Sequence, residues 1–379
     1  MADLPLVPRP FWLERIKRAW DAAPIAWLSG VRRVGKSSIA AQIPGALYLN
    51  CDLPSVQRLA EDPESLYGSI REKVVIFDEV HRLGDPSQVL KIGADTRPQL
   101  KILATGSSTL AALRTFRDSL AGRKREIALQ PVLFEELPRF GNATLEKRLL
   151  HGGLPSMLLS EHRDPGFYAE WLDSYYARDI AELFRIEKRR EFLRLARILM
   201  RQSGGMATVV ALAKECGASR PTVLTWLEAM RITHLLHEVP PFHGGAPGEI
   251  LKQPKLYAFD TGFVAHENGW DRLRRDDCGK LWEHVVLEHL LSRESHRTVH
   301  FWRNKTSEID FVIPRGRGSA DAIECKWSVE AFDPKGMRAL RALHPAGRNY
   351  LVCPSVPRPR VQRFGDLKVE VLTPGSITL

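Results

Sequence analysis

The sequence has little cysteine and no long hydrophobic run, and both absences restrict its class. Five cysteines occur in 379 residues, at scattered positions without a CxxC pair. This spacing argues against a zinc ribbon or a disulfide framework and suits a reducing cytoplasm. The N-terminal segment lacks an apolar signal core, and no apolar run is long enough to span a bilayer. We therefore expect a cytoplasmic chain without a membrane partner.

Length and charge indicate a multidomain protein with a preference for polyanions. A chain of 379 residues with 44% hydrophobic content predicts two to four domains with packed cores. The formal net charge of +10 favours a nucleic acid as partner, although basic residues also simply keep many proteins in solution.

A phosphate-binding loop is predicted at GVRRVGKSS. It follows a short buried-strand pattern and precedes a helical one, which is the context that a GxxxxGK[ST] loop requires. Glycines let backbone N–H groups approach phosphates, Lys36 reaches the β- and γ-phosphates, and the Ser37 hydroxyl ligates magnesium. The expected ligands are ATP and Mg²⁺. The residues expected to bind them are Gly30, Val31, Arg32, Arg33, Val34, Gly35, Lys36, Ser37 and Ser38.

Two further strands are predicted to end at the same site. KVVIFDEVHRL ends a buried strand in Asp78, which would hold magnesium through water, and Glu79, which would deprotonate the attacking water. LKILATGSS places Thr105 at the next strand end as a γ-phosphate sensor, while Ser107 or Ser108 also suits a helix N-cap. Strands that alternate with helical stretches predict a parallel sheet with helices on both faces.

The order of LSGVRRVGKSS, VVIFDEVHRL, ILATGSS and SLAGRKREIALQPVLFEEL resembles the prokaryotic AAA+ ATPases that carry a C-terminal domain of unknown function. The resemblance implies that Arg123, in the LAGR segment, is an arginine finger. Such a finger acts in trans on a neighbour's γ-phosphate, so it implies a homo-oligomer, expected as a hexameric ring. The alternative is that Arg123 is a surface arginine beside Lys124 and Arg125.

The middle of the chain combines an expected ATPase lid with a basic helical module. The lid is predicted over 140–187 and a winged helix over 188–245, where a helix-turn-helix pattern is followed by HLLHEV as the first strand of a wing. Arginines at helical spacing form a stripe that would contact DNA phosphates with weak sequence preference. The alternative is a structural helical module. The expected DNA contacts are Arg190, Arg194, Arg197, Arg201 and Arg220.

The C-terminal part resembles the PD-(D/E)xK nuclease fold, in the order helix acid, strand Asp, strand Glu-x-Lys. Ser307–Ser328 reads as a hairpin with Asp310 on one strand and Glu324 and Lys326 on the other. The resemblance implies that Asp310, Glu324 and Glu283 ligate magnesium while Lys326 activates water. At ~100° per residue Glu283 points inward and Glu288 points to solvent. The proline that precedes the Asp in this family is replaced by Ile309. A fold kept for DNA binding and a buried ion-pair network are the alternatives.

The sequence thus predicts an α/β protein with a P-loop AAA+ core (1–139), a helical lid (140–187), a winged helix (188–245) and a restriction-endonuclease-like domain (246–379). The expected function is ATP hydrolysis by a ring that binds or remodels DNA, including branched DNA. The alternative function is an ATP-gated regulatory switch without a DNA substrate.

Overall fold

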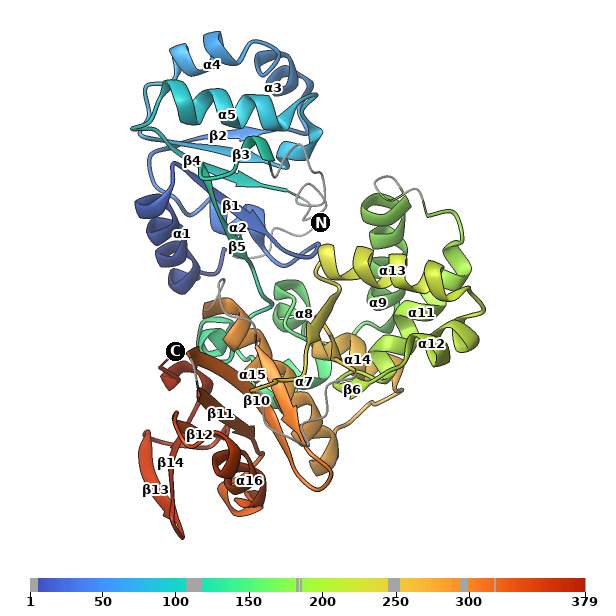
Figure 1. The fold of residues 1–379 in the computed structure, drawn as a ribbon. Helices are drawn as coiled ribbons and strands as arrows, with labels where there is room; N and C mark the ends of the chain where they lie inside the picture. The colour runs from blue at the N-terminus through green and yellow to red at the C-terminus, as the bar shows by residue number, and fades with distance from the viewer. Residues whose placement is uncertain are drawn as a thin grey trace.

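The computed structural model describes residues 6–106, 118–181, 184, 186–244, 253–293, 299–316 and 318–378. Figure 1 shows three parts: a blue-to-cyan α/β domain, a green-to-yellow helical module beside it, and an orange-to-red domain with its own sheet. No helix within these described ranges has the length and apolarity needed to cross a membrane.

The first part is built on a five-stranded parallel sheet, as the alternating pattern predicts. Its strands lie in the order β2-β3-β4-β1-β5, and all four pairings are parallel. The interior strand β1 is buried along its whole length, as expected for a parallel strand covered on both faces. The strands are β1 (Ile25–Ser29), β2 (Ala46–Asn50), β3 (Val74–Asp78), β4 (Lys101–Thr105) and β5 (Lys124–Ala128).

Two hydrophobic cores cover the two faces of this sheet. Because strand side chains alternate, Ala26 and Leu28 join Trp12 in one core, while Trp27 joins Phe77 in the other. Proline at the first turn and Asp62 or Asp85 as N-cap begin two of the covering helices. The helical elements are α1 (Pro10–Ala22), α2 (Lys36–Ala40), α3 (Pro54–Leu59), α4 (Pro63–Ser69), η1 (Val80–Arg82) and α5 (Pro86–Thr96).

The helical module contains the predicted helix-turn-helix segment and a small sheet. Ser219 caps α13 by accepting a hydrogen bond from the backbone N–H of Thr222, and strand β7 forms within the HLLHEV segment, where the sequence predicts a strand. The three-stranded sheet has the order β6-β8-β7, with β8 beyond residue 245. The elements are η3 (Phe134–Arg139), α7 (Leu145–His151), α8 (Pro155–Leu159), α9 (Pro165–Tyr175), the π-helix η4 (Tyr176–Ala181), α11 (Arg189–Arg201), β6 (Gly205–Met206), α12 (Val209–Cys216), α13 (Arg220–Ile232), β7 (Leu236–Val239) and β8 (Lys255–Ala258).

The C-terminal part has a six-stranded mixed sheet in the order β13-β14-β12-β11-β10-β9. The predicted hairpin is present, because β10 and β11 pair antiparallel with Phe311 opposite Ile323. The elements are α14 (Thr261–Glu267), α15 (Arg275–Arg293), β9 (His300–Arg303), β10 (Glu308–Gly316), β11 (Ser319–Cys325), η5 (Val329–Ala331), α16 (Lys335–Leu343), β12 (Asn349–Val352), β13 (Arg360–Phe364), β14 (Leu367–Leu372) and η6 (Pro374–Ser376).

A buried arginine, Arg148, connects the helical module to the C-terminal part. One of its partners is Glu288, which the sequence analysis placed in solvent. Arg148 is fully buried and donates hydrogen bonds to the Val132 carbonyl (2.8 Å), the Thr261 hydroxyl (2.8 Å) and Glu288. Glu288 is 2% exposed rather than solvated. The helical-wheel argument failed because α15 is buried on almost all sides, so a polar side chain on it meets protein in every direction.

The HGGLPS turn before α8 is explained by this junction. Gly152 has a φ of 93°, and a Cβ there would lie 2.1 Å from an Asp260 carboxylate oxygen. A Cβ on Gly153 would lie 2.4 Å from the Arg148 guanidinium carbon. Both glycines therefore let the chain pass close to buried charged side chains.

Candidate functional sites

The predicted phosphate-binding loop adopts a conformation that depends on glycine. Gly30 and Gly35 have φ values of 143° and 104°. A Cβ on Gly30 would lie 2.7 Å from the Leu129 carbonyl oxygen, so no larger residue fits there. Arg33, between them, also has a positive φ of 61°. The loop lies between β1 and α2, as the sequence predicts.

Lys36 begins α2 and points back over the loop. Its ammonium donates hydrogen bonds to the carbonyls of Gly30 (2.9 Å) and Val31 (3.1 Å). Burial lowers the pKa of Lys36, while the carboxylates of Glu79 and Asp179 act in the opposite direction. A buried ammonium at the centre of a loop of backbone N–H groups is suited to bind a polyphosphate.

A buried ion pair between Arg9 and Glu136, which the sequence did not reveal, contacts the backbone of the phosphate-binding loop. Arg9, just before α1, donates to the Val34 carbonyl in the loop (3.1 Å) and to Glu136 (2.8 and 2.7 Å). Arg9 and Glu136 are 3% and 4% exposed. The two residues are 127 positions apart, so no local pattern could have joined them.

Asp78 gathers three hydroxyl groups at the end of β3. Its Oδ1 accepts hydrogen bonds from Ser37 Oγ (3.2 Å) and from Thr105 Oγ1, and its Oδ2 accepts one from the Tyr48 hydroxyl (2.5 Å). Burial, followed by the hydrogen bond to Asp78, raises the pKa of Tyr48, which stays protonated as a donor. Ser37 and Asp78 thus lie together as oxygen ligands that suit Mg²⁺. Tyr48 was missed by the sequence reading.

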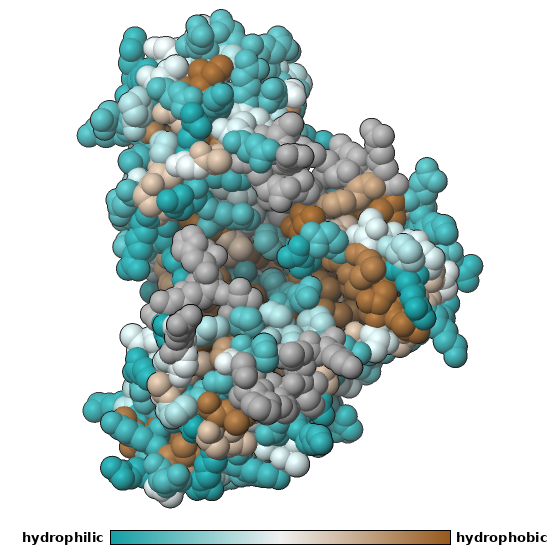
Figure 2. All heavy atoms as spheres, in the orientation of Figure 1, coloured by the Kyte–Doolittle hydropathy of each residue, from teal (hydrophilic) through white to brown (hydrophobic). Residues whose placement is uncertain are grey.

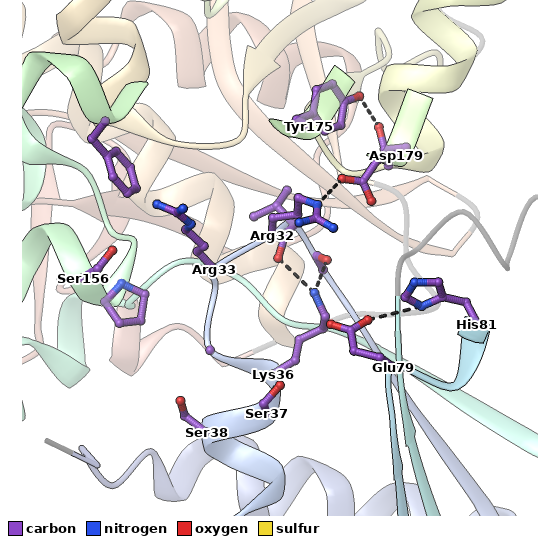
Figure 3. Close-up of a pocket in the computed structure, with 16 residues that line it drawn as sticks. Arg32, Arg33, Lys36, Ser37, Ser38, Glu79, His81, Ser156, Tyr175 and Asp179 are labelled. Carbon is purple, nitrogen blue, oxygen red and sulfur yellow. Dashed lines mark hydrogen bonds and ion pairs between the residues drawn. The ribbon is translucent and has the colours of Figure 1, made fainter. Parts of the chain in front are cut away.

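Glu79 sits in a strained backbone position beside a histidine. Its φ is 56°, which a non-glycine residue rarely adopts, and its backbone N–H donates to Thr105 Oγ1 at 3.1 Å. Its carboxylate lies 3.2 Å from His81 Nδ1 (Figure 3). Burial lowers the pKa of His81, so the ring is neutral near pH 7 and donates its Nδ1 proton to the carboxylate. His81, another residue that the sequence reading missed, therefore orients Glu79.

Lys36, Ser37, Glu79 and His81 line a cavity of about 600 Å³, and residues of the helical module form another part of its wall. Arg32, in the loop, pairs with Asp179 of η4 at 2.6 Å, and its carbonyl accepts a hydrogen bond from Trp171 Nε1 at 3.2 Å. Figure 3 shows Arg32 pointing at Asp179 across the cavity, with Lys36 and Glu79 below. The module residues in the lining are Pro155, Ser156, Phe167, Tyr175, Asp179 and Thr233.

Arg123 does not contact this cavity in its own chain. It precedes β5 at the edge where the parallel strands begin, whereas the loop and Asp78 lie at the edge where they end. Its guanidinium pairs with Asp95 of α5 at 2.6 Å, and about a third of its side chain is exposed. Ser107 and Ser108 lie outside the described residues.

The predicted arginine stripe lies exposed along α11 and borders a surface cavity of about 770 Å³. Arg197 and Arg201 lie 3.6 and 3.7 Å from Glu267, which neutralises part of their charge. The opposite face of α11 is buried, as the apolar spacing predicts. The exposed arginines are Arg190, Arg194, Arg197 and Arg201, with Arg220 at the start of α13.

The exposed face of α13 is less suited to phosphates than α11. Leu224 is 55% exposed there, and Arg231 is paired with Glu228 at 2.7 Å. Figure 2 shows hydrophobic surface over the part of the molecule that holds α12 and α13.

The C-terminal residues that the nuclease resemblance singled out form one charged cluster. Lys326 lies 2.7 Å from a Glu324 oxygen and 3.4 Å from an Asp310 oxygen, and Asp310 also accepts the Cys325 backbone N–H at 2.8 Å. Burial and then the charge of Asp310 raise the pKa of Glu324, which hydrogen-bonds to Asp310. Although burial acts against it, the charge of Lys326 holds the pKa of Asp310 below its usual value. The two carboxyls therefore share a proton beside one ammonium.

Glu283 approaches the cluster from α15. Burial and the charge of Asp310 raise its pKa to about 7, and the Tyr257 hydroxyl donates to it at 3.1 Å. Within the described ranges, no three His, Cys, Asp or Glu side chains are placed to hold a metal ion. Lys326 lies between the two acids, so the predicted magnesium ligation by Glu283, Asp310 and Glu324 and the alternative of a buried ion-pair network both stay predictions.

Replacing Lys326 by methionine should cost about 2 kcal/mol of unfolding free energy at pH 7.5, because two buried carboxyls lose their counter-ion at a partly exposed site. Both carboxyl pKa values would then lie above the unfolded value. Folding would take up protons, so the loss should shrink as the pH falls toward 5. Urea unfolding at several pH values, with the exposed Lys305→Met as control, measures this. A loss independent of pH would contradict the shared-proton cluster.

Three protein-family models match successive segments of the chain. Residues 22–138 match a family model described as an AAA domain. Residues 142–274 and 278–371 match two models that are each described as a domain of unknown function, DUF8612 and DUF4143. The N-terminal part therefore resembles an AAA domain and the C-terminal part matches a domain of unknown function, which agrees with that part of the predicted architecture. The winged-helix and nuclease-like assignments stay predictions.

Relatives match across the domains. An uncharacterised protein of Mycobacterium tuberculosis is 25% identical over 324 residues, covering 81% of this chain and 71% of that protein. One of Haemophilus influenzae is 21% identical over 344 residues, covering 81% and 84%. Among solved structures, a Walker-type ATPase of Pyrococcus abyssi is 17% identical over 67% of this chain and 94% of its own, with a TM-score of 0.42. The Thermotoga maritima RuvB Holliday junction branch migration motor is 15% identical over 62% and 90%, with a TM-score of 0.30. Scores this low decide nothing about function.

Proposed function

We propose that the protein hydrolyses ATP with Mg²⁺ and uses the reaction to bind or remodel DNA as an oligomeric ring. The observation that carries the ATPase proposal is that Lys36, Ser37 and Glu79 line one cavity. Asp78 is hydrogen-bonded to Ser37 next to it. Ser37 and Asp78 would hold Mg²⁺, which withdraws charge from the phosphates when bound.

The chain's own groups account for the remaining steps. The loop N–H groups and Lys36 bind the phosphates, Thr105 fixes Asp78 and the backbone of Glu79, and Glu79 accepts the proton of the attacking water. His81 holds the Glu79 carboxylate in place through its ring N–H.

The oligomer proposal depends on Arg123. Its place at the edge of the sheet opposite the cavity supports a role toward the cavity of a neighbouring copy. A hexameric ring, in which each Arg123 exchanges Asp95 for a neighbour's phosphate, is the proposed assembly. Mixing inactive Lys36→Ala subunits with Arg123→Ala subunits should then restore part of the activity, because one subunit supplies the arginine and the other the cavity.

The DNA proposal depends on the exposed arginines of α11. They contact phosphates well and bases poorly, so binding should depend on salt and only weakly on sequence. Asp310, Glu324 and Lys326, which lie together, stay the candidate nuclease-like site of the C-terminal part. The ATPase rate should be measured with single-stranded, duplex, forked and four-way DNA. A rate that no DNA alters would favour an ATP-gated switch, for which the cavity wall supplied by η4 is the supporting observation.

Replacing Arg190, Arg194 and Arg197 by glutamine should flatten the slope of log K against log salt by up to ~0.9 per lost phosphate contact. Fluorescence anisotropy with a labelled duplex between 50 and 300 mM salt measures it. The matched control removes three exposed arginines of the C-terminal part, Arg358, Arg360 and Arg363. Equal flattening by both triple variants would show that the charge effect is general, and would remove α11 as the DNA surface.

A further inference from the structure

The ion pair between Arg32 and Asp179 is the most direct link between the phosphate-binding loop and the helical module. Arg32 Nε and Asp179 Oδ2 lie 2.6 Å apart, although the residues are 147 positions apart in sequence. The side chain of Asp179 is 8% exposed and that of Arg32 is 28% exposed. A carboxylate this well buried interacts strongly with nearby charges, because little water screens it.

Asp179 is an anion inside a cavity whose other features select anions. Burial lowers the pKa of Lys36, and the negative charge of Asp179 acts in the opposite direction. Asp179 therefore interacts electrostatically with the ammonium that would bind phosphate. A phosphate oxygen and the Asp179 carboxylate therefore compete for the same two cations, Arg32 and Lys36. The more negative the ligand, the more it repels Asp179 and the better it replaces Asp179 as partner of Arg32.

The segment that carries Asp179 is connected to the rest of the module by buried contacts. It lies in the π-helix η4, a geometry often found at functional positions. Tyr176 of η4 donates a hydrogen bond to the Ile186 carbonyl just before α11, and its ring packs on Phe192 of α11. Tyr175 bonds to Thr233 at the end of α13 at 2.6 Å. η4 is thus in direct contact with α11, and Tyr175, the last residue of α9 immediately before η4, connects this segment to the end of α13.

We propose that Asp179 is a specificity-determining latch of the nucleotide cavity. It holds the module on Arg32 and is released when a nucleoside triphosphate supplies a phosphate to Arg32 in its place. A diphosphate carries less charge and releases it less. This inference rests on the proposed ATPase function. It predicts that the helical module is released from Arg32 when the chain binds a triphosphate.

The test uses the full chain and measures binding of ATP and ADP in the presence of Mg²⁺, with turnover prevented by a non-hydrolysable ATP analogue. Asp179→Asn should bind the triphosphate about tenfold more tightly than wild type, because one nearby like charge is removed in a partly screened site. Its affinity for ADP should change less. Asp173→Asn, which removes a carboxylate that is 53% exposed and pairs with Arg189, is the matched control and should behave as wild type.

A second measurement does not depend on a variant folding. In the wild-type chain, amide hydrogen exchange of residues 176–181 should rise when the triphosphate analogue binds and should change less with ADP. Unchanged exchange in this segment, or a triphosphate affinity of Asp179→Asn no greater than that of Asp173→Asn, overturns the latch. If the latch is overturned but the wild-type chain binds the triphosphate analogue and Lys36→Ala does not, the proposed nucleotide-binding function is retained. A wild-type chain that binds neither nucleotide overturns both.

Discussion

Glu79→Gln should bind ATP with near wild-type affinity and hydrolyse it at least ~100-fold more slowly, the usual scale for the loss of a positioned base. Glutamine keeps the shape of the side chain and still accepts the His81 ring N–H, which lies 3.2 Å from the carboxylate. It cannot take a proton from water. Phosphate release under saturating ATP measures the rate, and titration with a fluorescent ATP analogue measures binding.

Two controls separate chemistry from binding in this experiment. Lys36→Ala should lose nucleotide binding altogether, because its ammonium is the buried cation of the loop. Glu64→Gln, at an exposed position in the first turn of α4, should retain full activity. Wild-type turnover in Glu79→Gln would remove Glu79 from the mechanism.

Arg148→Met should destabilise the folded chain by about 3–5 kcal/mol, because it removes one partner of a buried, hydrogen-bonded pair. Burial already raises the pKa of Glu288 to about 8, so without Arg148 this carboxyl must take up a proton or stay charged without a counter-ion. The substitution removes the donor of the Val132 carbonyl and the partner of the Glu288 carboxyl in the interior, while the Thr261 hydroxyl keeps its bond to the backbone carbonyl of residue 148. Denaturant unfolding of the full chain, followed through the buried tryptophans, measures the loss.

The double variant Arg148→Met with Glu288→Met should recover much of that loss, since no buried charge remains. Arg189→Met, which breaks an exposed pair with Asp173, should cost less than about 1 kcal/mol. If the double variant were as unstable as Arg148→Met alone, the charge of Glu288 would not be the source of the cost.

The parts of this molecule that follow from local pattern were predictable. The continuous apolar runs before Ser29, Asp78 and Thr105 predict buried parallel strands, and the loop and Asp78 come together because parallel strands end at one edge. The hairpin of β10 and β11 was predictable for the same reason, since alternation and a Gly-rich turn are local signals.

The parts that depend on distant pairing were not predictable. Asp179 reaches Arg32 only because the helical module folds back over the loop. The sequence order of Glu283, Asp310 and Glu324 does not say whether an ion or Lys326 will neutralise them, because either solution satisfies the same charges. A helix buried all round, such as α15, carries no amphipathic signal from which the direction of Glu288 could be read.

The placing of β8 in the middle of the small sheet has a consequence for how such genes can be rearranged. β8 pairs with both β6 and β7, yet it comes after them along the chain and runs on through the Asp260 cap into α14. A recombination joint between β7 and β8 would separate two edge strands from the strand that pairs with both. Exchange of this module between proteins is therefore expected at joints outside the sheet, near residues 142 and 274, where the matched family segment begins and ends.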